Sequence, residues 1–219
     1  MLSGNEACCG HRCRGGSDAE SLRGICGLVK FRNLEATWPT LMLQRVPILE
    51  TERLRLRAHG VSDFSHLAEM WADSEVTRYI GGHPLSTEDC WARLLRYAGH
   101  WQLLGFGYWL VEERSTGKFV GDIGFADYKR EVPVPASLQG VPECGWVLAR
   151  HAQGKGYATE AVRAVLNWGD DHFGSRETVC LIHPDNGASI RVALKCGYRE
   201  LQRSMYRGQP TQIFVRPGL

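Results

Sequence analysis

A glycine-rich turn is the part of the sequence whose residue types and spacing most directly indicate chemistry. Gln153-Gly154-Lys155-Gly156-Tyr157-Ala158 lies between a short apolar run and a stretch with apolar residues at helical spacing. Glycines let the backbone approach a ligand closely, and the first N–H groups of the following helix point outward at the positive end of its dipole. The turn therefore predicts a cradle for phosphate.

Three other interpretations of this turn have different requirements. A Walker-type loop needs glycine five residues before its Gly-Lys pair and Ser or Thr after it, and Ala149 and Gly156 occupy those places. A dinucleotide fingerprint starting at Gly154 needs Gly or Ala where Thr159 stands. The third interpretation, a turn that serves only helix–strand packing, stays open from the hexapeptide alone.

Hydrophobic periodicity indicates which elements precede the turn. Apolar residues alternate with arginines over residues 53–58, which is typical of a strand with one buried face. Helical spacing begins near Ser62, with Ser62 or Asp63 placed to cap the first turn. A second helix is expected to follow Ser86-Thr87-Glu88-Asp89, which resembles a capping box, and to end near Gly105.

The rest of the chain extends this pattern into one mixed, partly antiparallel sheet covered by about four helices. We expect Asn186 to open the last helix, with Ile190, Ala193 and Leu194 on its inner side. In chain order the remaining expected elements are a hairpin at 107–113 and 118–127, a strand at 144–148, the helix after the glycine turn, a strand at 178–182, the Asn186 helix, and strands at 198–206 and 212–216.

Composition places the chain among ordinary globular proteins. It has 219 residues, which suits one domain, and 43% are hydrophobic and 23% charged. The net charge of +2, with scattered basic residues, gives no reason to expect nucleic-acid binding. No apolar stretch approaches the ~20 residues needed to cross a bilayer, and the N-terminus lacks the order of a secretory signal. We therefore expect a cytoplasmic protein without nucleic-acid or membrane partners.

The first 45 residues lack the patterning of the rest, so we expect residues 1–45 to be a flexible or non-native extension and residues 46–219 to be the domain. The extension lacks the paired Cys-x-x-Cys halves of a zinc site, which favours a loose tail over a metal site. Its candidate ligands are Cys8, Cys9, His11, Cys13 and Cys26. The cysteines expected to be reduced core thiols are Cys90, Cys144, Cys180 and Cys196.

The glycine turn and the motifs after it resemble the GNAT superfamily of N-acetyltransferases. Gln-x-x-Gly-x-Ala at 153–158 is followed by Thr-Glu-Ala at 159–161, Asn-Gly-Ala-Ser at 186–189 and Lys-Cys-Gly-Tyr at 195–198. The chain is most similar to the branch that holds the ribosomal-protein N-terminal (alanine) acetyltransferases and some aminoglycoside acetyltransferases. The resemblance implies an α/β (α+β) fold, with a mixed, mostly antiparallel sheet of about six to seven strands, about four flanking helices and splayed central strands.

The resemblance also implies acetyl-CoA as co-substrate, and no cluster of residues outside the leader indicates a metal. The pantetheine arm would enter a gap between the strands at 144–149 and 178–182 and pair with main chain as an added strand does. The diphosphate would rest on the N–H groups of residues 154–159, with Arg150 and Lys155 supplying positive charge. The expected coenzyme-binding residues are Val147, Leu148, Ala149, Gln153, Gly154, Lys155, Gly156, Tyr157, Ala158, Thr159 and Asn186.

Acetyl transfer from a thioester needs a neutral amine and a stabilised tetrahedral intermediate. Free amines have pKa values of about 7.7–8 at an α-amino group and about 10.4 in lysine, so a base or a water chain leading to one is required. Glu143 is the candidate base, and a solvated strand-end carboxylate is the alternative interpretation of this residue. A free N–H at Val147 or Leu148 is suited to stabilise the oxyanion.

The leaving thiolate needs a proton, and here the sequence departs from the resemblance. Many relatives use a tyrosine at the position that Ala193 occupies. This leaves Ser189, Tyr157 or water as the acid. We favour Ser189 because the ribosomal-protein branch also has serine in its Asn-x-x-Ser motif, although a second helix-capping contact would explain it equally well.

The sequence determines the amine acceptor least. A protein N-terminus, a polyamine and an aminoglycoside-like amine all stay open, as do a monomer and a homodimer. The rival to an enzyme is a non-catalytic acyl-CoA-binding sensor or interaction module, which the missing tyrosine allows. Aromatic residues that could line an acceptor cleft, or simply fill the core, are Trp71, Tyr79, Trp91, Trp101, Trp109 and Trp146.

Overall fold

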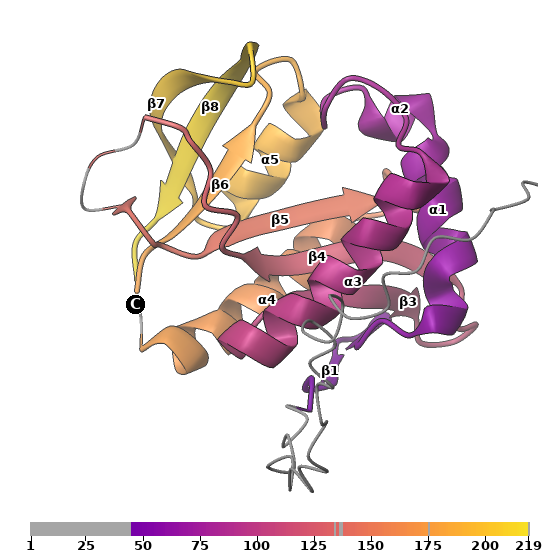
Figure 1. The fold of residues 1–219 in the computed structure, drawn as a ribbon. Helices are drawn as coiled ribbons and strands as arrows, with labels where there is room; N and C mark the ends of the chain where they lie inside the picture. Colours follow the sequence, from indigo (N-terminus) through magenta and orange to yellow (C-terminus); the bar gives the residue numbers. More distant parts are fainter. Residues whose placement is uncertain (1–44, 134, 136–137, 175, 219) are drawn as a thin grey trace, which may run out of the picture. The chain divides into compact units, whose positions relative to one another are not determined.

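A mixed β-sheet forms the centre of the fold in the computed structural model, which describes residues 45–133, 135, 138–174 and 176–218. The leader cysteines and the proposed extension to residue 44 lie outside the described residues. The strands are β1 (Leu49–Glu50), β2 (Leu54–Arg57), β3 (Tyr108–Glu113), β4 (Phe119–Ala126), β5 (Glu143–Leu148), β6 (Thr178–Ile182), β7 (Arg199–Tyr206) and β8 (Gln209–Arg216). They follow the order β1-β2-β3-β4-β5-β6-β8-β7 across the sheet (Figure 1).

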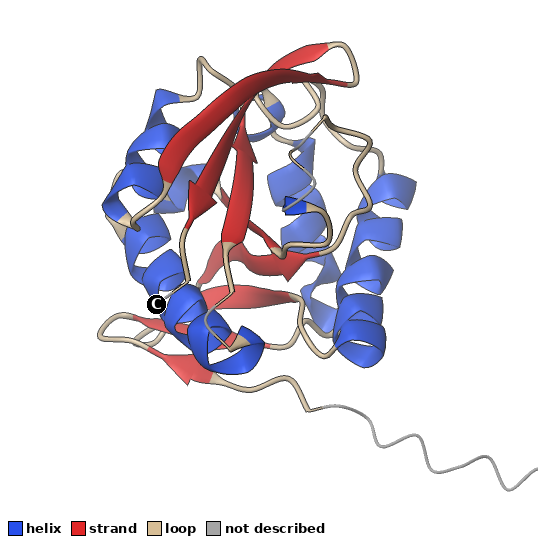
Figure 2. Ribbon diagram, turned by 90° about the vertical axis from the view of Figure 1, so that its left-hand side faces the viewer, coloured by secondary structure: helices blue, strands red, loops and turns tan. Residues whose placement is uncertain are grey.

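Helices cover both faces of this sheet (Figures 1 and 2). On one face lie α1 (Phe64–Ala72), α2 (Ser74–Thr77) and α3 (Thr87–Leu104), and on the other lie α4 (Tyr157–Phe173) and α5 (Gly187–Lys195). Alternate residues of β3 pack into the two cores, because successive side chains of a strand point to opposite faces. Trp109 and Val111 pack with residues of α4, whereas Tyr108 and Leu110 pack with residues of α1 and α3.

The predicted mixed, mostly antiparallel sheet is confirmed, with eight strands and five helices among the described residues. The additional strand and helix are β1, of two residues, and α2, of four, which are too short to show a period. The capping box is also confirmed, because the Ser86 hydroxyl accepts a hydrogen bond from Asp89 N at 3.0 Å. Gly105, in the left-handed conformation, ends α3 as expected.

Two expectations about helix residues were wrong. Leu194 was expected on the inner side of its helix but is 55% exposed, whereas Ala193 is fully buried and Ile190 packs partly against the core. Asp63 stands at the N-cap of α1, but its carboxylate makes no capping bond. It accepts hydrogen bonds from Arg57 and from Gly60 N instead, because the short helical turn at 61–63 places it beside β2.

The centre of the sheet contains a fork. Every neighbouring pair of strands is antiparallel except β5 and β6, which run parallel and pair only at Glu143 and Val179. Beyond this point β6 diverges from β5, while β5 stays paired with β4 along its whole length (Figure 1). The expected splayed strands are therefore present, and a gap opens along the edge of β5 that carries Trp146 and Leu148.

Candidate active site

The main chain of β5 offers one of its two edges to the fork. Ala149 N donates to Val120 O at 3.0 Å, so this N–H is already paired toward β4. N–H groups two residues apart on a strand point the same way, and Val147 is the register partner of Asp122 on β4. The backbone N–H groups of Val147 and Ala149 therefore point toward β4. The N–H groups of the residues that alternate with them point into the gap.

Leu148 is the predicted main-chain contact whose N–H faces the fork. The same alternation directs Trp146 N and Leu148 N away from β4. The Leu148 carbonyl agrees with this direction, because it accepts a hydrogen bond from the side-chain amide of Gln153 at 3.0 Å. Gln153 thus joins the end of β5 to the glycine turn, and Trp146 N is a second fork-facing donor that sequence reasoning missed.

The glycine turn has the geometry of an anion cradle. Gly154 and Gly156 have φ values of 76° and 82°, in the left-handed region that favours glycine. Gly156 is the N-cap of α4 and has no side chain to cap the helix. The first helical bond runs from Glu160 N to Gly156 O, so the N–H groups of residues 157–159 precede it and lack helical partners. The N–H groups of Tyr157, Ala158 and Thr159 are therefore available to donate to an anion.

Arg53 adds positive charge beside the cradle, although sequence reasoning treated it as part of a solvated strand face. Its guanidinium lies 4.7 Å from the centre of the Tyr157 ring and donates to Lys155 O at 3.0 Å. It also forms an ion pair with Glu160. Burial alone would raise the pKa of Glu160, but hydrogen bonds from Thr51 and Arg53 hold it below its usual value. Glu160 thereby fixes Arg53 at the mouth of the turn.

The two cations expected to hold phosphate lie at the surface. Lys155 is exposed, with Nζ 5.8 Å from the Tyr157 ring centre. The Arg150 side chain is 63% exposed and lies 3.4 Å from an Asp73 carboxylate oxygen. Both remain able to reach a bound anion, although Arg150 would have to leave Asp73 to do so.

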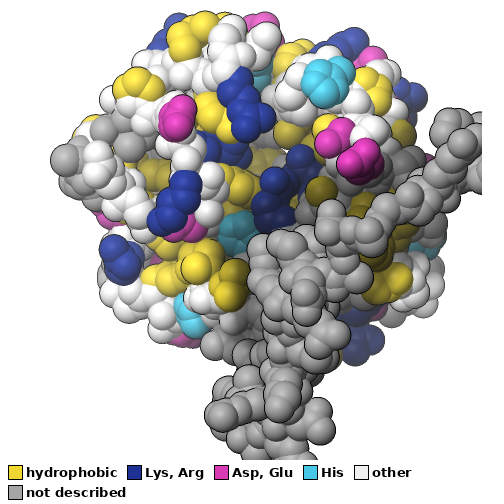
Figure 3. Space-filling view, in the orientation of Figure 1, with side chains coloured by type: hydrophobic (Ala, Val, Ile, Leu, Met, Phe, Trp, Pro, Cys, Tyr) yellow, Lys and Arg dark blue, Asp and Glu magenta, His cyan; other side chains and the backbone are white. Residues whose placement is uncertain are grey.

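A pocket of about 610 Å³ opens where β5 and β6 diverge. Of the predicted site residues, it is lined by Glu143, Val147, Asn186 and Ser189, whereas the turn at 153–159 lies outside it. Figure 3 shows Lys and Arg side chains around a hollow with a hydrophobic floor on this face. The structure therefore separates the predicted site into a cradle at the start of α4 and a pocket at the fork.

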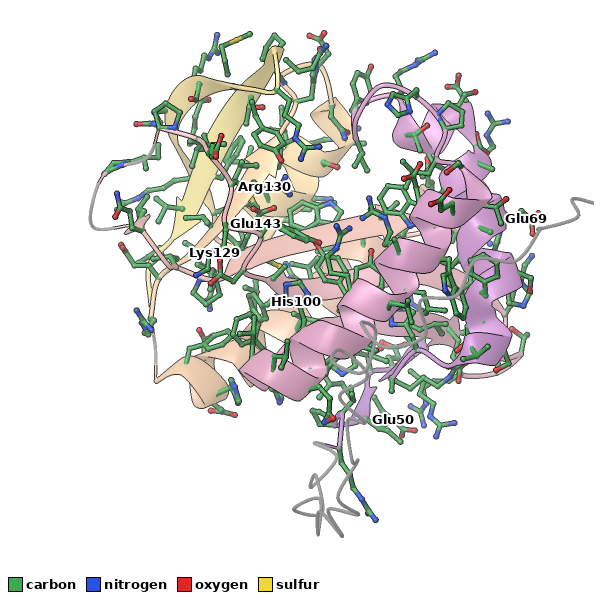
Figure 4. All side chains as sticks on the ribbon, viewed as in Figure 1. Glu50, Glu69, His100, Lys129, Arg130 and Glu143 are labelled. Carbon is green, nitrogen blue, oxygen red and sulfur yellow. The ribbon has the colours of Figure 1, made fainter. Side chains whose placement is uncertain are left out.

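Glu143 enters the pocket at the last paired position of β5 and β6. Its side chain is only 13% exposed, and Arg130 holds it through two hydrogen bonds of 2.6 and 2.7 Å (Figure 4). It is therefore not the solvated strand-end carboxylate of the alternative interpretation. Each carboxylate oxygen keeps a further lone pair, so Glu143 can still accept a hydrogen bond from a water or an amine.

The start of α5 brings Ser189 to the same pocket. Asn186 is the N-cap, and its side-chain oxygen accepts a hydrogen bond from Ser189 N at 3.1 Å, as expected. Ala193 is fully buried. The Tyr157 hydroxyl donates to a Glu113 carboxylate at 3.1 Å and does not line the pocket. Of the two side chains considered as the acid, Ser189 is thus the one that reaches the fork.

Buried aromatic and basic side chains form the part of the pocket beneath α3. The Tyr97 and Tyr108 rings stack with centres 4.8 Å apart, and burial raises the pKa of both hydroxyls well above the usual value. A Cβ on Gly145 would overlap the Tyr108 hydroxyl, so glycine at this position of β5 admits the ring. The Arg93 guanidinium lies 3.7 Å from the centre of the Trp71 ring. These residues connect α3 to the strand that carries Glu143.

Sequence reasoning identified part of this lining. Trp71, Tyr79 and Trp146 line the pocket, whereas Trp101 and Trp109 belong to the core and Trp91 is 38% exposed. Sequence reasoning missed several residues of the lining, because polar side chains on amphipathic elements have the pattern of a solvated face. The four-residue spacing of Arg93 and Tyr97 was the available signal for two of them. The missed residues are Arg93, Tyr97, Tyr108, Tyr128, Arg130 and His183.

Two classes of site find no support in the described part of the chain. None of its helices combines the length and the apolar composition that a membrane span requires. Nor do its His, Cys, Asp and Glu side chains form a group of three or more that could hold a metal ion. The four cysteines from Cys90 onward are free and buried, as expected.

Known proteins resemble this chain in sequence and in structure. Residues 53–199 match the family model described as an acetyltransferase (GNAT) domain. Two Bacillus subtilis proteins are similar in sequence: the uncharacterized protein YkkB, 32% identical over 77% of this chain and 94% of its own, and the uncharacterized N-acetyltransferase YoaA, 29% identical over 74% and 89%. A putative GNAT-family acetyltransferase from Bordetella pertussis is similar in structure, with a TM-score of 0.68 and 26% identity over 78% of this chain and 99% of that one.

Proposed function

This chain belongs to the GNAT family of acetyltransferases, and from that premise we propose that a primary amine attacks acetyl-CoA directly in a ternary complex on this protein. The family assignment makes the protein an acetyl-CoA-dependent N-acetyltransferase. The observation that carries the proposed arrangement is the fork. The fork opens beside the pocket that Glu143 and Ser189 line, and the chain continues from the far end of β5 into the turn at the start of α4.

The coenzyme is proposed to lie along this path. Its diphosphate rests on the N–H groups of residues 154–159, with positive charge from Lys155 and Arg53. Its pantetheine arm pairs with the fork-facing edge of β5 through Trp146 and Leu148, as an added strand would. Asn186, which lines the pocket, contacts the end of the arm. This path delivers the thioester to the pocket.

The reacting groups are proposed to meet between β5 and α5. Glu143 accepts the proton of the amine through a chain of waters, because about 16 Å of strand separate its position from that of Leu148, while Arg130 fixes its carboxylate. The amine nitrogen bonds to the thioester carbon, and Leu148 N donates to the oxygen that becomes negative. The carbon–sulfur bond then breaks, and Ser189 gives its proton to the thiolate and regains one from water. Acetylated amine and free coenzyme A are the products.

A non-catalytic acyl-CoA sensor is the second candidate. Ala193 favours it, because many relatives have a tyrosine acid at this position and the alanine here is fully buried. Ser189 and Glu143 in one pocket favour the enzyme. Release of free thiol from acetyl-CoA in the presence of an amine separates the two, because a sensor binds the coenzyme without releasing thiol.

Calorimetric titration with coenzyme A tests the cradle. We expect binding by the wild-type protein and at least a tenfold weaker affinity for Gly156→Val, because a side chain strains the left-handed turn and crowds Arg53, whose Nη2 would lie 3.4 Å from the new Cβ. Gly117→Val is the matched control, since Gly117 is also left-handed, with φ of 69°, but lies in the β3–β4 turn with open space around it. Absence of heat with the wild-type protein, or equal affinities for the two variants, contradicts the cradle.

We also propose that residues 46–219 form the acetyltransferase domain after an extension at 1–45. The family match over residues 53–199 supports the domain. A cytoplasmic location is supported by the four free, buried thiols. A monomer and a homodimer both stay open, and sedimentation of the full chain would decide between them.

A further inference from the structure

Resting on the proposed function, we propose that the acceptor is a small amine that carries a carboxylate, such as an α-amino acid. Arg93 and Tyr97 of α3 bind this carboxylate, while the amine faces Glu143.

The charges around the pocket favour an acceptor with a negative group. Glu143 is the one carboxylate among the described residues that line it, and Arg130 pairs with it through both oxygens. The basic residues of the same lining are more numerous: Arg78, Arg93, Arg96, Arg130 and Arg207. Arg78 is paired with Glu75 and Arg130 with Glu143, which leaves Arg93, Arg96 and Arg207 to repel a polycationic acceptor such as a polyamine and to attract a carboxylate.

Arg93 and Tyr97 lie close to each other, and each has a hydrogen-bonding group without a partner of good geometry. The Tyr97 side chain is only 1% exposed, and its hydroxyl has no hydrogen-bond partner. Arg93 Nε is buried and likewise lacks a partner, while the guanidinium stacks on Trp71. Buried donors without partners are costly, and most native proteins satisfy them. Both residues line the pocket, but these two atoms have almost no accessible surface, so a ligand carboxylate reaches both donors only as neighbouring side chains shift.

The Tyr97 hydroxyl is protonated at neutral pH, as a tyrosine ordinarily is, so it can donate to a carboxylate. Burial raises its pKa further above the usual value. Tyr97 and Arg93 are four residues apart on α3 and therefore lie on one face of the helix. They form a carboxylate subsite with two donors.

The position of this subsite relative to Glu143 determines how far apart the carboxylate and the amine of the acceptor lie. Tyr97 stacks on Tyr108, and the Tyr108 hydroxyl lies over Gly145, two residues from Glu143 along β5. The carboxylate subsite is thus one tyrosine ring away from the strand that carries the proposed base. A pocket of about 610 Å³ that must also admit the thioester suits a single small molecule. These dimensions favour an amino acid over the end of a protein chain.

The test measures thiol release by the full chain with acetyl-CoA and matched acceptors. The panel holds the twenty amino acids, the corresponding amino acid amides, spermidine and short acidic peptides. We expect kcat/KM for at least one amino acid to exceed that for its amide by tenfold or more, with spermidine slower still. The comparison isolates the carboxylate because the amine and the side chain are unchanged within each pair.

Two variants test whether residues of α3 cause the preference for an amino acid over its amide. Arg93→Gln should reduce the preference for the amino acid over its amide to about one, and Tyr97→Phe, which removes only the unpartnered hydroxyl, should reduce it about threefold or more. Arg203→Gln is the control, because it removes the same charge from an exposed residue of β7 outside the pocket lining and should leave the preference unchanged.

The outcomes separate this inference from the proposed function. Thiol release that is as fast with amides or spermidine as with amino acids overturns the carboxylate requirement, and release that is as fast with acidic peptides overturns the small acceptor. Either result leaves the acetyltransferase in place. Failure of every carboxylate-bearing amine, while coenzyme A binds, also overturns it. If kcat/KM falls equally for the amino acid and for its amide in both variants, Arg93 and Tyr97 do not bind the carboxylate. Absence of coenzyme binding defeats the proposed function itself, and the inference with it.

Discussion

Glu143 and Ser189 show how two residues from separate elements become one candidate site. Glu143 lies at the only register pair between β5 and β6, so the strands begin to diverge where its side chain enters the pocket. Ser189 lies in the first turn of α5, where its backbone N–H caps on Asn186 and its side chain remains on the pocket wall. The capping bond uses the N–H, so it does not occupy the hydroxyl that the proposed mechanism needs.

Replacing either side chain tests the proposed proton transfers. We expect Glu143→Gln and Ser189→Ala each to lower kcat by tenfold or more, because general acid–base groups typically contribute 10²–10⁴-fold. The Kd for coenzyme A should stay within about twofold, since neither side chain lies at the cradle. Steady-state kinetics and calorimetry measure the two quantities, with Ser62→Ala, an exposed serine, as control. A variant that keeps the wild-type kcat removes that residue from the mechanism.

Residues differ in how far the sequence predicts them. The glycine turn was predictable because left-handed turns and helix starts restrict residue type locally. Glu143 and Ser189 became candidates only through the resemblance to a family. Arg93 was missed because an arginine on an amphipathic helix has the same pattern whether it faces solvent or a pocket, and Arg130 because it lies in the loop between β4 and β5, which has no period. What distinguishes them is contact with elements distant in sequence, which periodicity does not contain.

At the scale of elements, α3 is capped at both ends and carries the proposed carboxylate subsite on one face. The Ser86 hydroxyl accepts from Asp89 N at its start, and left-handed Gly105 closes its last turn. Between them, buried Leu94, Tyr97 and Trp101 fix the helix on the sheet. Because Arg93 shares this helix, the caps also position the proposed carboxylate subsite.

Removal of the N-terminal cap should destabilise the protein measurably. We expect Ser86→Ala to lower the free energy of unfolding by about 1 kcal/mol, because an N-cap hydroxyl satisfies a helical N–H that would otherwise lack a partner. Urea unfolding followed by circular dichroism gives the value. Ser86→Thr keeps a capping hydroxyl and should lose much less. Equal losses in the two variants, or none in Ser86→Ala, would show that the cap contributes nothing.

Local and long-range pairing explain which elements could be predicted. The β3–β4 hairpin, α3 and α4 follow from alternation, caps and helical spacing within one segment. The single parallel contact of β5 with β6 joins strands separated by α4, so no local pattern encodes it. The resemblance to a family supplied the fork. Leu194 was placed wrongly for a related reason, because α5 has only nine residues and its apolar positions do not define one face.

At the scale of the whole molecule, two carboxylates connect β2 and the segment before it to the helices on opposite faces of the sheet. Asp63, beside α1, accepts from both terminal nitrogens of Arg57 at 2.8 and 2.9 Å. Glu160, on α4, accepts from Thr51 at 2.6 Å and from Arg53 at 2.7 Å. The Glu160 contacts join segments more than a hundred residues apart and the Asp63 contacts fix the start of α1 on β2, so their loss should affect the global free energy of unfolding.

The two carboxylates should make the fold sensitive to acid. Burial alone would raise the pKa of Asp63, but its hydrogen bonds to Arg57 and Gly60 N lower it, and the pKa of Glu160 is lowered in the same way. Free carboxyls titrate near 3.9 and 4.3, so below about pH 5 the unfolded chain binds more protons than the folded one. The stabilisation from these two carboxylates is therefore complete above about pH 5. The free energy of unfolding should fall as the pH decreases toward 3.

Urea unfolding between pH 7 and pH 3 measures this dependence. The double variant Asp63→Asn/Glu160→Gln should be less stable at pH 7, because two guanidinium groups lose their partners, but its stability should fall less steeply below pH 5. The exposed pair Glu69→Gln/Asp185→Asn removes the same number of carboxylates and should keep the wild-type slope (Figure 4 shows Glu69 on the outer side of α1). If all three proteins show the same slope, Asp63 and Glu160 are not the source of the acid sensitivity.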